Sequence, residues 1–327
     1  MDEYVLSLSY GKDSMACLGA IKELGWPLTR IVHAEIWATD TIPADLPPMV
    51  EFKKKADKWI KDNFGIDVEH VCARRPLSGA EREREREFST KLSFERQFYQ
   101  DLVSNKHGIT RIYGWPFQRG PWCNSRLKTR PQDDLRKRLL SGNGGEVEEM
   151  RSNTGVAYGE RQLVQQAEDG KFYNSALTQG AKKNIVQYLG IAIDETERVE
   201  RHINKENIKL PLVEMGWDEA YCRQWCEEMG LLSPIYTDSE RGGCWFCHNQ
   251  GVDQLRLLRK KYPEYWQLML EWDKDSPVTF KPNGRTVQDF EIRFQMEDEN
   301  LYPEGKAFRW KFVDQYIASK QGIQGET

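Results

Sequence analysis

A short segment near the N-terminus has the residues of an anion-binding turn. It stands between an apolar run at 4–9, which predicts a buried strand, and a stretch from Gly11 to Leu24, which predicts a helix. Backbone N–H groups at the start of such a helix can approach an anion closely, and the helix dipole favours negative charge there. The segment consists of Ser9, Tyr10, Gly11, Lys12, Asp13 and Ser14.

The residue types in this segment suit a phosphate group. Gly11 permits a tight turn, Lys12 adds a positive charge, and the hydroxyls of Ser9 and Ser14 can donate hydrogen bonds. The spacing G-x-x-x-x-G-K-S of a Walker A loop is missing, so the segment does not belong to that class. We therefore predict a phosphate site, and the alternative is a helix that is simply capped by Ser9.

A basic stretch at 119–138 is a second candidate for anion binding. The planar fork of Arg126 and the charge of Lys128 suit a pair of phosphate or sulfate oxygens, whereas a solvated helix face is the alternative. Two acidic residues, Asp133 and Asp134, accompany the basic side chains. The basic residues are Arg119, Arg126, Lys128, Arg130, Arg136, Lys137 and Arg138.

Four cysteines have a spacing close to that of a structural zinc site. Cys222 and Cys226 share one face of a predicted helix, and Cys244 and Cys247 form a C-x-x-C knuckle after two glycines, with His248 as a substitute ligand. An iron–sulfur cluster that also uses Cys123, a redox pair of thiols, and ordinary buried thiols are the alternatives. Cys17 and Cys72 stand in predicted core elements, where we expect them to fill space.

The composition is that of an ordinary globular chain. Of its 327 residues, 39% are hydrophobic and 30% charged, and the net charge of -4 gives no global indication of nucleic-acid binding. No stretch approaches the roughly 18 apolar residues that span a bilayer, so we expect no membrane partner. The acidic N-terminus is unlike a signal peptide, and the odd number of seven cysteines favours a reducing compartment. We therefore expect a cytoplasmic protein.

The order of predicted elements indicates an α/β fold with a doubly wound, mainly parallel sheet over residues 1–205. Within it, residues 141–183 carry seven glycines and predict an inserted loop, and residues 206–327 predict a mainly helical C-terminal region. Strands are expected at 4–9, 30–37, 66–72, 110–114 and 185–193, and helices at 11–24, 47–64, 92–105, 217–229, 251–261 and 263–274.

The segment S-x-G-K-D-S resembles the PP-loop of the adenine nucleotide α-hydrolase superfamily. Within that superfamily the chain is most similar to the phosphoadenosine phosphosulfate reductase-like branch, especially forms often found in phage and mobile elements, although Tyr10 replaces a glycine. Four further segments over roughly residues 4–200 carry the resemblance. They are Asp40-Thr41, Pro48 with Glu51-Phe52 downstream of it, the W-C-N-S-R-L-K segment at 122–128, and the segment from Gly190 to Arg198.

The resemblance implies where an adenine nucleotide binds. In such a fold the ligand lies at the carboxyl ends of the strands, near the reversal of strand order. Ala34 and Ile36, within 33–37, would present backbone to the adenine. Gly114 and Trp115 would border the base, and a core position is the alternative for Trp115.

Several polar residues acquire roles from the same resemblance. Asp40 would order a ribose or a metal ion, or cap a loop, and Arg198 would complete the anion site. Asp194 and Glu195 would bind Mg²⁺, position a nucleophile or cap a helix.

The activity implied is that of an ATP pyrophosphatase. The α-phosphate of ATP would adenylate an acceptor, with Mg²⁺, Lys12, Arg126 and Lys128 stabilising the pyrophosphate leaving group. The acceptor could be a small molecule, tRNA or DNA. One alternative is reduction of phosphoadenosine phosphosulfate, but no cysteine follows Cys247 where the thioredoxin-dependent reductases carry their nucleophile in an E-C-G-x-H segment. A nucleotide-sensing protein without catalysis is the other alternative.

Overall fold

The computed structural model describes residues 2–85, 89–103, 110–116, 121–140, 184–238, 243–303 and 307–324. The chain divides into two compact units. Unit 1 comprises Met1–Phe94 and Cys123–Cys244, and unit 2 comprises Glu95–Trp122 and Trp245–Thr327. The insertion predicted at 141–183 lies outside the described residues.

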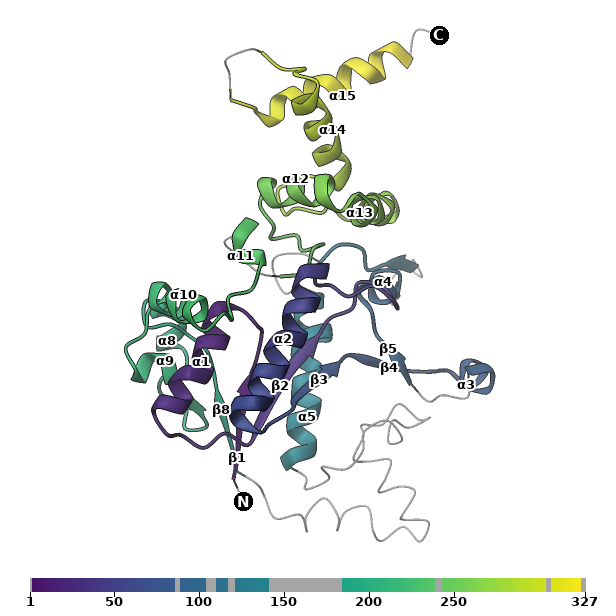
Figure 1. Ribbon diagram of the computed structural model, residues 1–327. Helices are drawn as coiled ribbons and strands as arrows, with labels where there is room; N and C mark the ends of the chain where they lie inside the picture. The colour runs from purple at the N-terminus through teal and green to yellow at the C-terminus, as the bar shows by residue number, and fades with distance from the viewer. Residues whose placement is uncertain are drawn as a thin grey trace. The chain divides into compact units, whose positions relative to one another are not determined.

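A five-stranded sheet with only parallel pairings forms the centre of unit 1 (Figure 1). The strand order is β3-β2-β1-β8-β9, so β1 lies between the strand that follows it and a strand from much later in the chain. The strands are β1 (Glu3–Ser7), β2 (Arg30–Glu35), β3 (Val68–Cys72), β8 (Ile185–Tyr188) and β9 (Ile208–Lys209).

Helices cover both faces of this sheet. On one face, Leu6 and Ile31 share a core with residues of α1 (Lys12–Glu23), α2 (Pro47–Phe64) and α10 (Glu219–Glu228). On the other face, Val5 and Val32 pack with Leu135 of α5 (Arg130–Leu140). Successive strand residues point to opposite faces, which is why Val5 and Leu6 enter different cores. This architecture is α/β and is compatible with a doubly wound sheet.

Local sequence signals place the ends of α2 as expected. Pro47 occupies the first turn of the helix, where its missing N–H is not needed, and Gly65 ends it at a φ of 69°. The shorter helices of unit 1 are α3 (Gly79–Glu85), α8 (Thr196–Glu200), α9 (Pro211–Glu214) and α11 (Ile235–Asp238), and a π-helix, η1 (Asn124–Thr129), precedes α5. A hairpin of β4 (Arg74–Pro76) and β5 (Ser89–Lys91) completes the unit.

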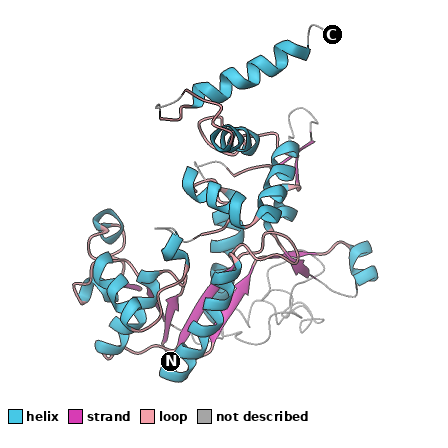
Figure 2. Cartoon of the chain, turned by 45° about the horizontal axis from the view of Figure 1, so that its top comes forward, coloured by secondary structure: helices cyan, strands magenta, loops and turns pink. Residues whose placement is uncertain are grey.

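Unit 2 is built mainly from helices (Figure 2). Aromatic side chains such as Phe98, Trp115 and Phe280 pack against one another in its core. Its helices are α4 (Phe94–Phe98), α12 (Val252–Lys261), α13 (Pro263–Asp275), α14 (Val287–Asp298) and α15 (Trp310–Gln324). The helices predicted at 251–261 and 263–274 are confirmed as α12 and α13.

The prediction that 110–114 supplies a strand of the parallel sheet is wrong. These residues contribute β7 (Thr110–Ile112), which pairs antiparallel with β6 (Asp101–Val103) in a separate two-stranded sheet of unit 2. The helix predicted over 92–105 is shortened to α4 for the same reason, because β6 takes up residues that the prediction gave to the helix. Residues 206–244 cluster with the sheet, whereas the sequence indicated a domain boundary after residue 205.

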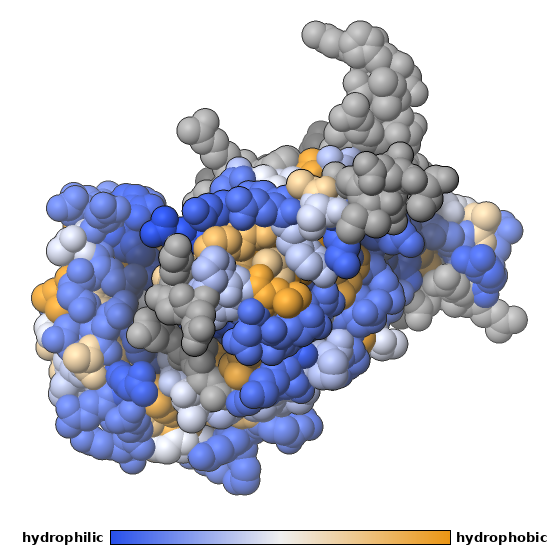
Figure 3. All heavy atoms as spheres, turned by 90° about the horizontal axis from the view of Figure 1, so that it is seen from above, coloured by the Kyte–Doolittle hydropathy of each residue, from blue (hydrophilic) through white to orange (hydrophobic). Residues whose placement is uncertain are grey.

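Within the described residues, no helix is both long enough and apolar enough to cross a membrane. Hydrophilic side chains (blue) dominate the face shown in Figure 3, and apolar residues (orange) form interrupted areas between them.

Candidate functional site

The predicted phosphate loop lies at the carboxyl end of β1, next to the point where the strand order reverses between β1 and β8. Two serine hydroxyls hold its shape. The Ser14 Oγ accepts a hydrogen bond from the Ser9 backbone N–H at 3.2 Å and donates one to the Gly11 carbonyl oxygen at 3.0 Å. The hydroxyls of Ser9 and Ser14 lie 3.0 Å apart. Both serines are therefore engaged in shaping the turn.

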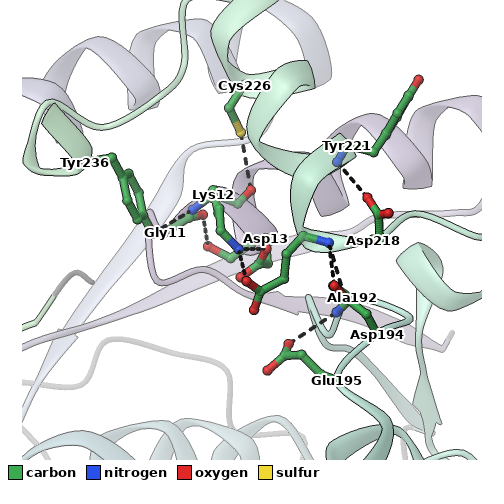
Figure 4. Close-up of polar contacts among 12 residues, drawn as sticks. Gly11, Lys12, Asp13, Ala192, Asp194, Glu195, Asp218, Tyr221, Cys226 and Tyr236 are labelled. Carbon is green, nitrogen blue, oxygen red and sulfur yellow. Dashed lines mark hydrogen bonds and ion pairs between the residues drawn. The ribbon is translucent and has the colours of Figure 1, made fainter. Parts of the chain in front are cut away.

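The start of α1 presents backbone donors at this loop. Its first intrahelical hydrogen bond runs from the Met15 N–H to the Gly11 carbonyl oxygen, so the N–H groups of Lys12, Asp13 and Ser14 precede the helix ladder. The Lys12 N–H donates to the hydroxyl of Tyr236, on α11, at 3.2 Å (Figure 4). A hydroxyl oxygen thus occupies a position where an anion oxygen could also accept this hydrogen bond.

Three carboxylates gather beside the loop, and Lys12 contacts two of them. Figure 4 shows the contact of Lys12 with Asp13. Asp13, Glu195 and Glu219 each offer an oxygen, and these oxygens lie within 4.8 Å of one another. The Lys12 Nζ lies 2.8 Å from Asp13 Oδ1 and 3.2 Å from Glu219 Oε2. Hard carboxylate oxygens in such a group match the ligand preference of Mg²⁺.

Burial and charge shift the pKa values of this group. Burial raises the pKa of Asp13, and the negative charges of Glu219 and Glu195 add to the effect, although Lys12 opposes it. Burial acts to lower the pKa of Lys12, but its hydrogen bonds and charge interactions with Asp13 and Glu219 outweigh that effect, and the pKa is raised. Lys12 is therefore a cation at neutral pH.

Two backbone contacts bring the later carboxylates to the loop. The Glu195 Oε1 accepts a hydrogen bond from the Ala192 N–H at 3.3 Å, and its Oε2 pairs with Arg198. The Asp194 carboxylate accepts the Glu219 N–H at 3.2 Å and so docks the start of α10. The contact of Asp194 agrees with a helix-capping role. Glu195 stands at the N-cap of α8 and lies in the group of three carboxylates, so its role stays a prediction.

The other predicted nucleotide contacts in unit 1 occupy separate places. Ala34 is buried near the end of β2, and Ile36 follows that strand. Asp40 lies in the loop after it, where its Oδ1 accepts from Ser93 Oγ at 3.3 Å and its carbonyl oxygen accepts from Lys91 Nζ at 3.4 Å. These contacts agree with a loop-capping role for Asp40.

Gly114 and Trp115 belong to unit 2. Trp115 is 1% exposed, and its Nε1 donates to the Asp273 Oδ1 at 2.9 Å. Gly114 has a φ of 67°, and an added Cβ would lie 2.6 Å from Ser276 Oγ. These contacts agree with the core alternative for Trp115, and Gly114 packs closely against Ser276.

The basic segment packs against β2 through η1, which carries Arg126 and Lys128. Lys128 is exposed, and its charge contributes to lowering the pKa of His33 on β2, where burial is the main cause. Arg126 is half-buried. Arg119 lies outside the described residues.

Cys222 and Cys226 are fully buried in the core between α10 and α1. The Cys226 Sγ donates to the Lys12 carbonyl oxygen at 3.3 Å, and burial raises the pKa of each thiol to about 12. The burial of both thiols and the contact of Cys226 with a backbone carbonyl agree with the buried-thiol alternative for this pair. Among the described residues, Asp13, Glu195 and Glu219 form the one group of three or more closely spaced potential ligands.

The two cysteines of the C-x-x-C knuckle belong to different units, because unit 1 ends at Cys244 and Cys247 belongs to unit 2. In unit 2, Cys247 and His248 lie in a turn that Lys281 holds by donating to the carbonyl oxygens of His248 and Gln250. His248 is 3% exposed, and neither of its ring nitrogens has a hydrogen-bond partner among the residues that the structure describes. Unpaired buried nitrogens are costly, which makes His248 a candidate for an additional ligand.

No protein-family model matches this chain, and no curated protein matches it. Two residues of the site, Glu219 and Tyr236, were not among the sequence candidates. Each lies more than 200 positions after the loop that it contacts, and Tyr236 is separated from Lys12 by 224 positions in the sequence. No local signal in the sequence indicates such a contact.

Proposed function

We propose that this chain is a PP-loop ATP pyrophosphatase with the doubly wound fold of the adenine nucleotide α-hydrolases. It binds ATP at the start of α1 and promotes attack on the α-phosphate, so that the adenylate passes to an acceptor and pyrophosphate leaves. The observation that carries the proposal is the group of carboxylates from Asp13, Glu195 and Glu219 at the carboxyl end of β1, two of which pair with Lys12. A cation and a set of metal-binding oxygens beside the N–H groups at the start of a helix suit a metal–polyphosphate ligand.

The three carboxylates would hold Mg²⁺, which, when bound, neutralises charge on the phosphates and polarises the phosphorus–oxygen bonds. The donor set fits this ion, since it consists of oxygens only. Lys12 balances part of the negative charge of the group, because it contacts both Asp13 and Glu219. With Mg²⁺ held by these carboxylates, the Lys12 ammonium would be available to bind phosphate oxygens.

The rest of the proposed nucleotide site rests on the resemblance to the family. The N–H groups of Lys12, Asp13 and Ser14 bind the phosphates, and the backbone at Ala34 and Ile36 borders the adenine. Arg126 and Lys128 stabilise the leaving pyrophosphate from η1. The acceptor is a small molecule, tRNA or DNA.

Reduction of phosphoadenosine phosphosulfate is the weaker alternative. It needs a thiolate nucleophile, and Cys222 and Cys226 have pKa values of about 12 because they are buried. In this alternative the nucleophile would be Cys244 or Cys247.

Calorimetric titration with nucleotides tests the proposal. We expect ATP to bind in the presence of Mg²⁺ and to bind at least about tenfold more weakly in EDTA, because three carboxylates then repel the phosphates. The Lys12→Ala variant should lose most of the affinity, and Lys22→Ala, on the same helix, should keep it. Equal affinities with and without the metal would contradict the proposed role of the carboxylates.

A further inference from the structure

Tyr10 has a backbone conformation that its residue type rarely adopts. Its φ is 57°, in the left-handed region, and it is one of two non-glycine residues with positive φ among the described residues. A side chain in this region clashes with the neighbouring backbone, so the conformation persists only where other contacts stabilise it. Tyr10 lies between Ser9 and Gly11, in the middle of the phosphate loop.

The Tyr10 side chain supplies such contacts. It is fully buried, and its hydroxyl donates a hydrogen bond to Asp57 Oδ1 on α2. The same hydroxyl lies 3.2 Å from the Nε2 of His70 on β3, and this nitrogen lies 3.0 Å from Asp57 Oδ2. The three polar groups therefore close a triangle that joins the loop to α2 and β3.

A second set of hydrogen bonds holds the residue at the start of the loop. The Leu8 carbonyl oxygen lies 2.8 Å from His33 Nδ1, and His33 Nε2 lies 2.7 Å from Lys53 Nζ. An ammonium group can only donate, so His33 accepts at Nε2 and donates from Nδ1 to Leu8. Lys53 lies on α2 and also pairs with Asp45, in the loop that precedes this helix. This second set of contacts therefore also ties the loop to α2.

The two sets of contacts touch each other at their aromatic rings. The Tyr10 ring packs edge-on against His33, with centroids 4.8 Å apart, and the Lys53 Nζ lies 5.4 Å from the centre of the Tyr10 ring. Both sets of partners lie on α2, on β2 and β3 and in the loop that precedes α2. Lys12 and the three carboxylates are held instead by α1, α10 and the segment after β8.

We propose that Tyr10 is a positioning residue that holds the phosphate loop in its anion-binding shape without touching the ligand. Its anchored ring and hydroxyl replace the conformational freedom that a glycine would have at this position, and they fix the direction of the backbone that leads into Gly11 and Lys12. The identity of the ligand as an adenine nucleotide rests on the proposed function, but the anchoring of the loop does not.

Amide hydrogen exchange of residues 9–15, combined with ATP titration, tests this role. The Tyr10→Phe variant removes only the hydroxyl. The matched control is Tyr188→Phe, because Tyr188 is also fully buried in the same core and its hydroxyl donates to the Pro27 carbonyl oxygen at 2.8 Å. We expect Tyr10→Phe to raise the exchange rate of the loop amides and the Kd for ATP by about tenfold over the control, as for loss of a hydrogen bond to a charged group.

Exchange of the loop amides in Tyr10→Phe that is no faster than in Tyr188→Phe would overturn the inference. Asp57 provides a second comparison if Tyr10→Phe does not fold, since Asp57→Asn keeps an oxygen acceptor for the Tyr10 hydroxyl and Asp57→Leu does not. Faster exchange is expected in Asp57→Leu alone, and equal rates in the two variants would also overturn it. Failure of the wild-type protein to bind ATP would contradict the proposed function, while the exchange comparison would still decide the role of Tyr10.

Discussion

Gly190 packs directly against the backbone of Asp13. An added Cβ at Gly190 would lie 2.8 Å from the Asp13 carbonyl oxygen and 2.8 Å from the Ser14 Cα, both of which are backbone atoms that cannot rotate away. The absence of a side chain at Gly190 therefore lets the segment after β8 approach the start of α1. That approach brings Glu195 to the phosphate loop.

The first prediction concerns this close contact. Gly190→Ala should displace the start of α1 or the segment that carries Glu195, and weaken Mg·ATP binding by about tenfold or more. Gly251→Ala is the control, because Gly251 has a φ of -71° and an added Cβ there would meet nothing within 4 Å. Calorimetry measures the affinity, and an unchanged Kd in Gly190→Ala would show that the contact does not shape the site.

The second prediction separates the two roles of Glu219. Glu219→Gln removes a metal ligand and also a partner of Lys12, so we expect Mg·ATP to bind about tenfold more weakly and metal-free ATP to bind more tightly. The matched control is Glu227→Gln, since Glu227 lies on the same helix and pairs with Arg223 at 3.0 Å. A loss of affinity that is equal with and without Mg²⁺ would contradict this assignment.

Much of the site could be predicted from local sequence. The loop from Ser9 to Ser14 is local, because a strand, a glycine and a helix start are adjacent in the chain, and the structure places it at the end of β1. Glu219 could not be found in this way, since its position depends on the Asp194 carboxylate that docks α10. Residues 110–115 were misplaced because a short apolar run does not show which sheet or core it joins.

The third prediction concerns pH. Burial, with Glu219 and Glu195, raises the pKa of Asp13 above its ordinary value of 3.8, so the carboxylate takes up a proton at a higher pH than an exposed aspartate. A metal needs the ionised form, and Mg²⁺-dependent ATP binding should therefore weaken as the pH falls through this raised pKa. Without metal, the same shift means that the folded state binds the proton more tightly than the unfolded state, so this group stabilises the fold more as the pH falls.

Titrations of ATP with Mg²⁺ over the acidic range measure this effect, with Asp13→Asn as the comparison. We expect the variant to bind Mg·ATP weakly and to lose most of the pH dependence. A pH dependence that survives in Asp13→Asn would assign it to another group.

The fourth prediction concerns the cysteines. Cys222 and Cys226 serve the core, so Cys222→Ala and Cys226→Ala should leave the zinc and iron content of the purified protein unchanged. Cys247→Ser and His248→Gln should lower it, because His248 has two buried ring nitrogens without hydrogen-bond partners. Plasma emission spectrometry measures both metals. Loss of metal from Cys222→Ala, or a wild-type protein free of zinc and iron, would contradict this prediction.

Product analysis in ¹⁸O-labelled water tests the central claim most directly. The protein is incubated with ATP and Mg²⁺, and the products are separated and examined by mass spectrometry. Attack at the α-phosphate predicts AMP and pyrophosphate, with the label in AMP when water replaces the acceptor, and loss of both products in Lys12→Ala. Formation of ADP and phosphate, tight binding of ATP without turnover, or release of sulfite from phosphoadenosine phosphosulfate without pyrophosphate would contradict it.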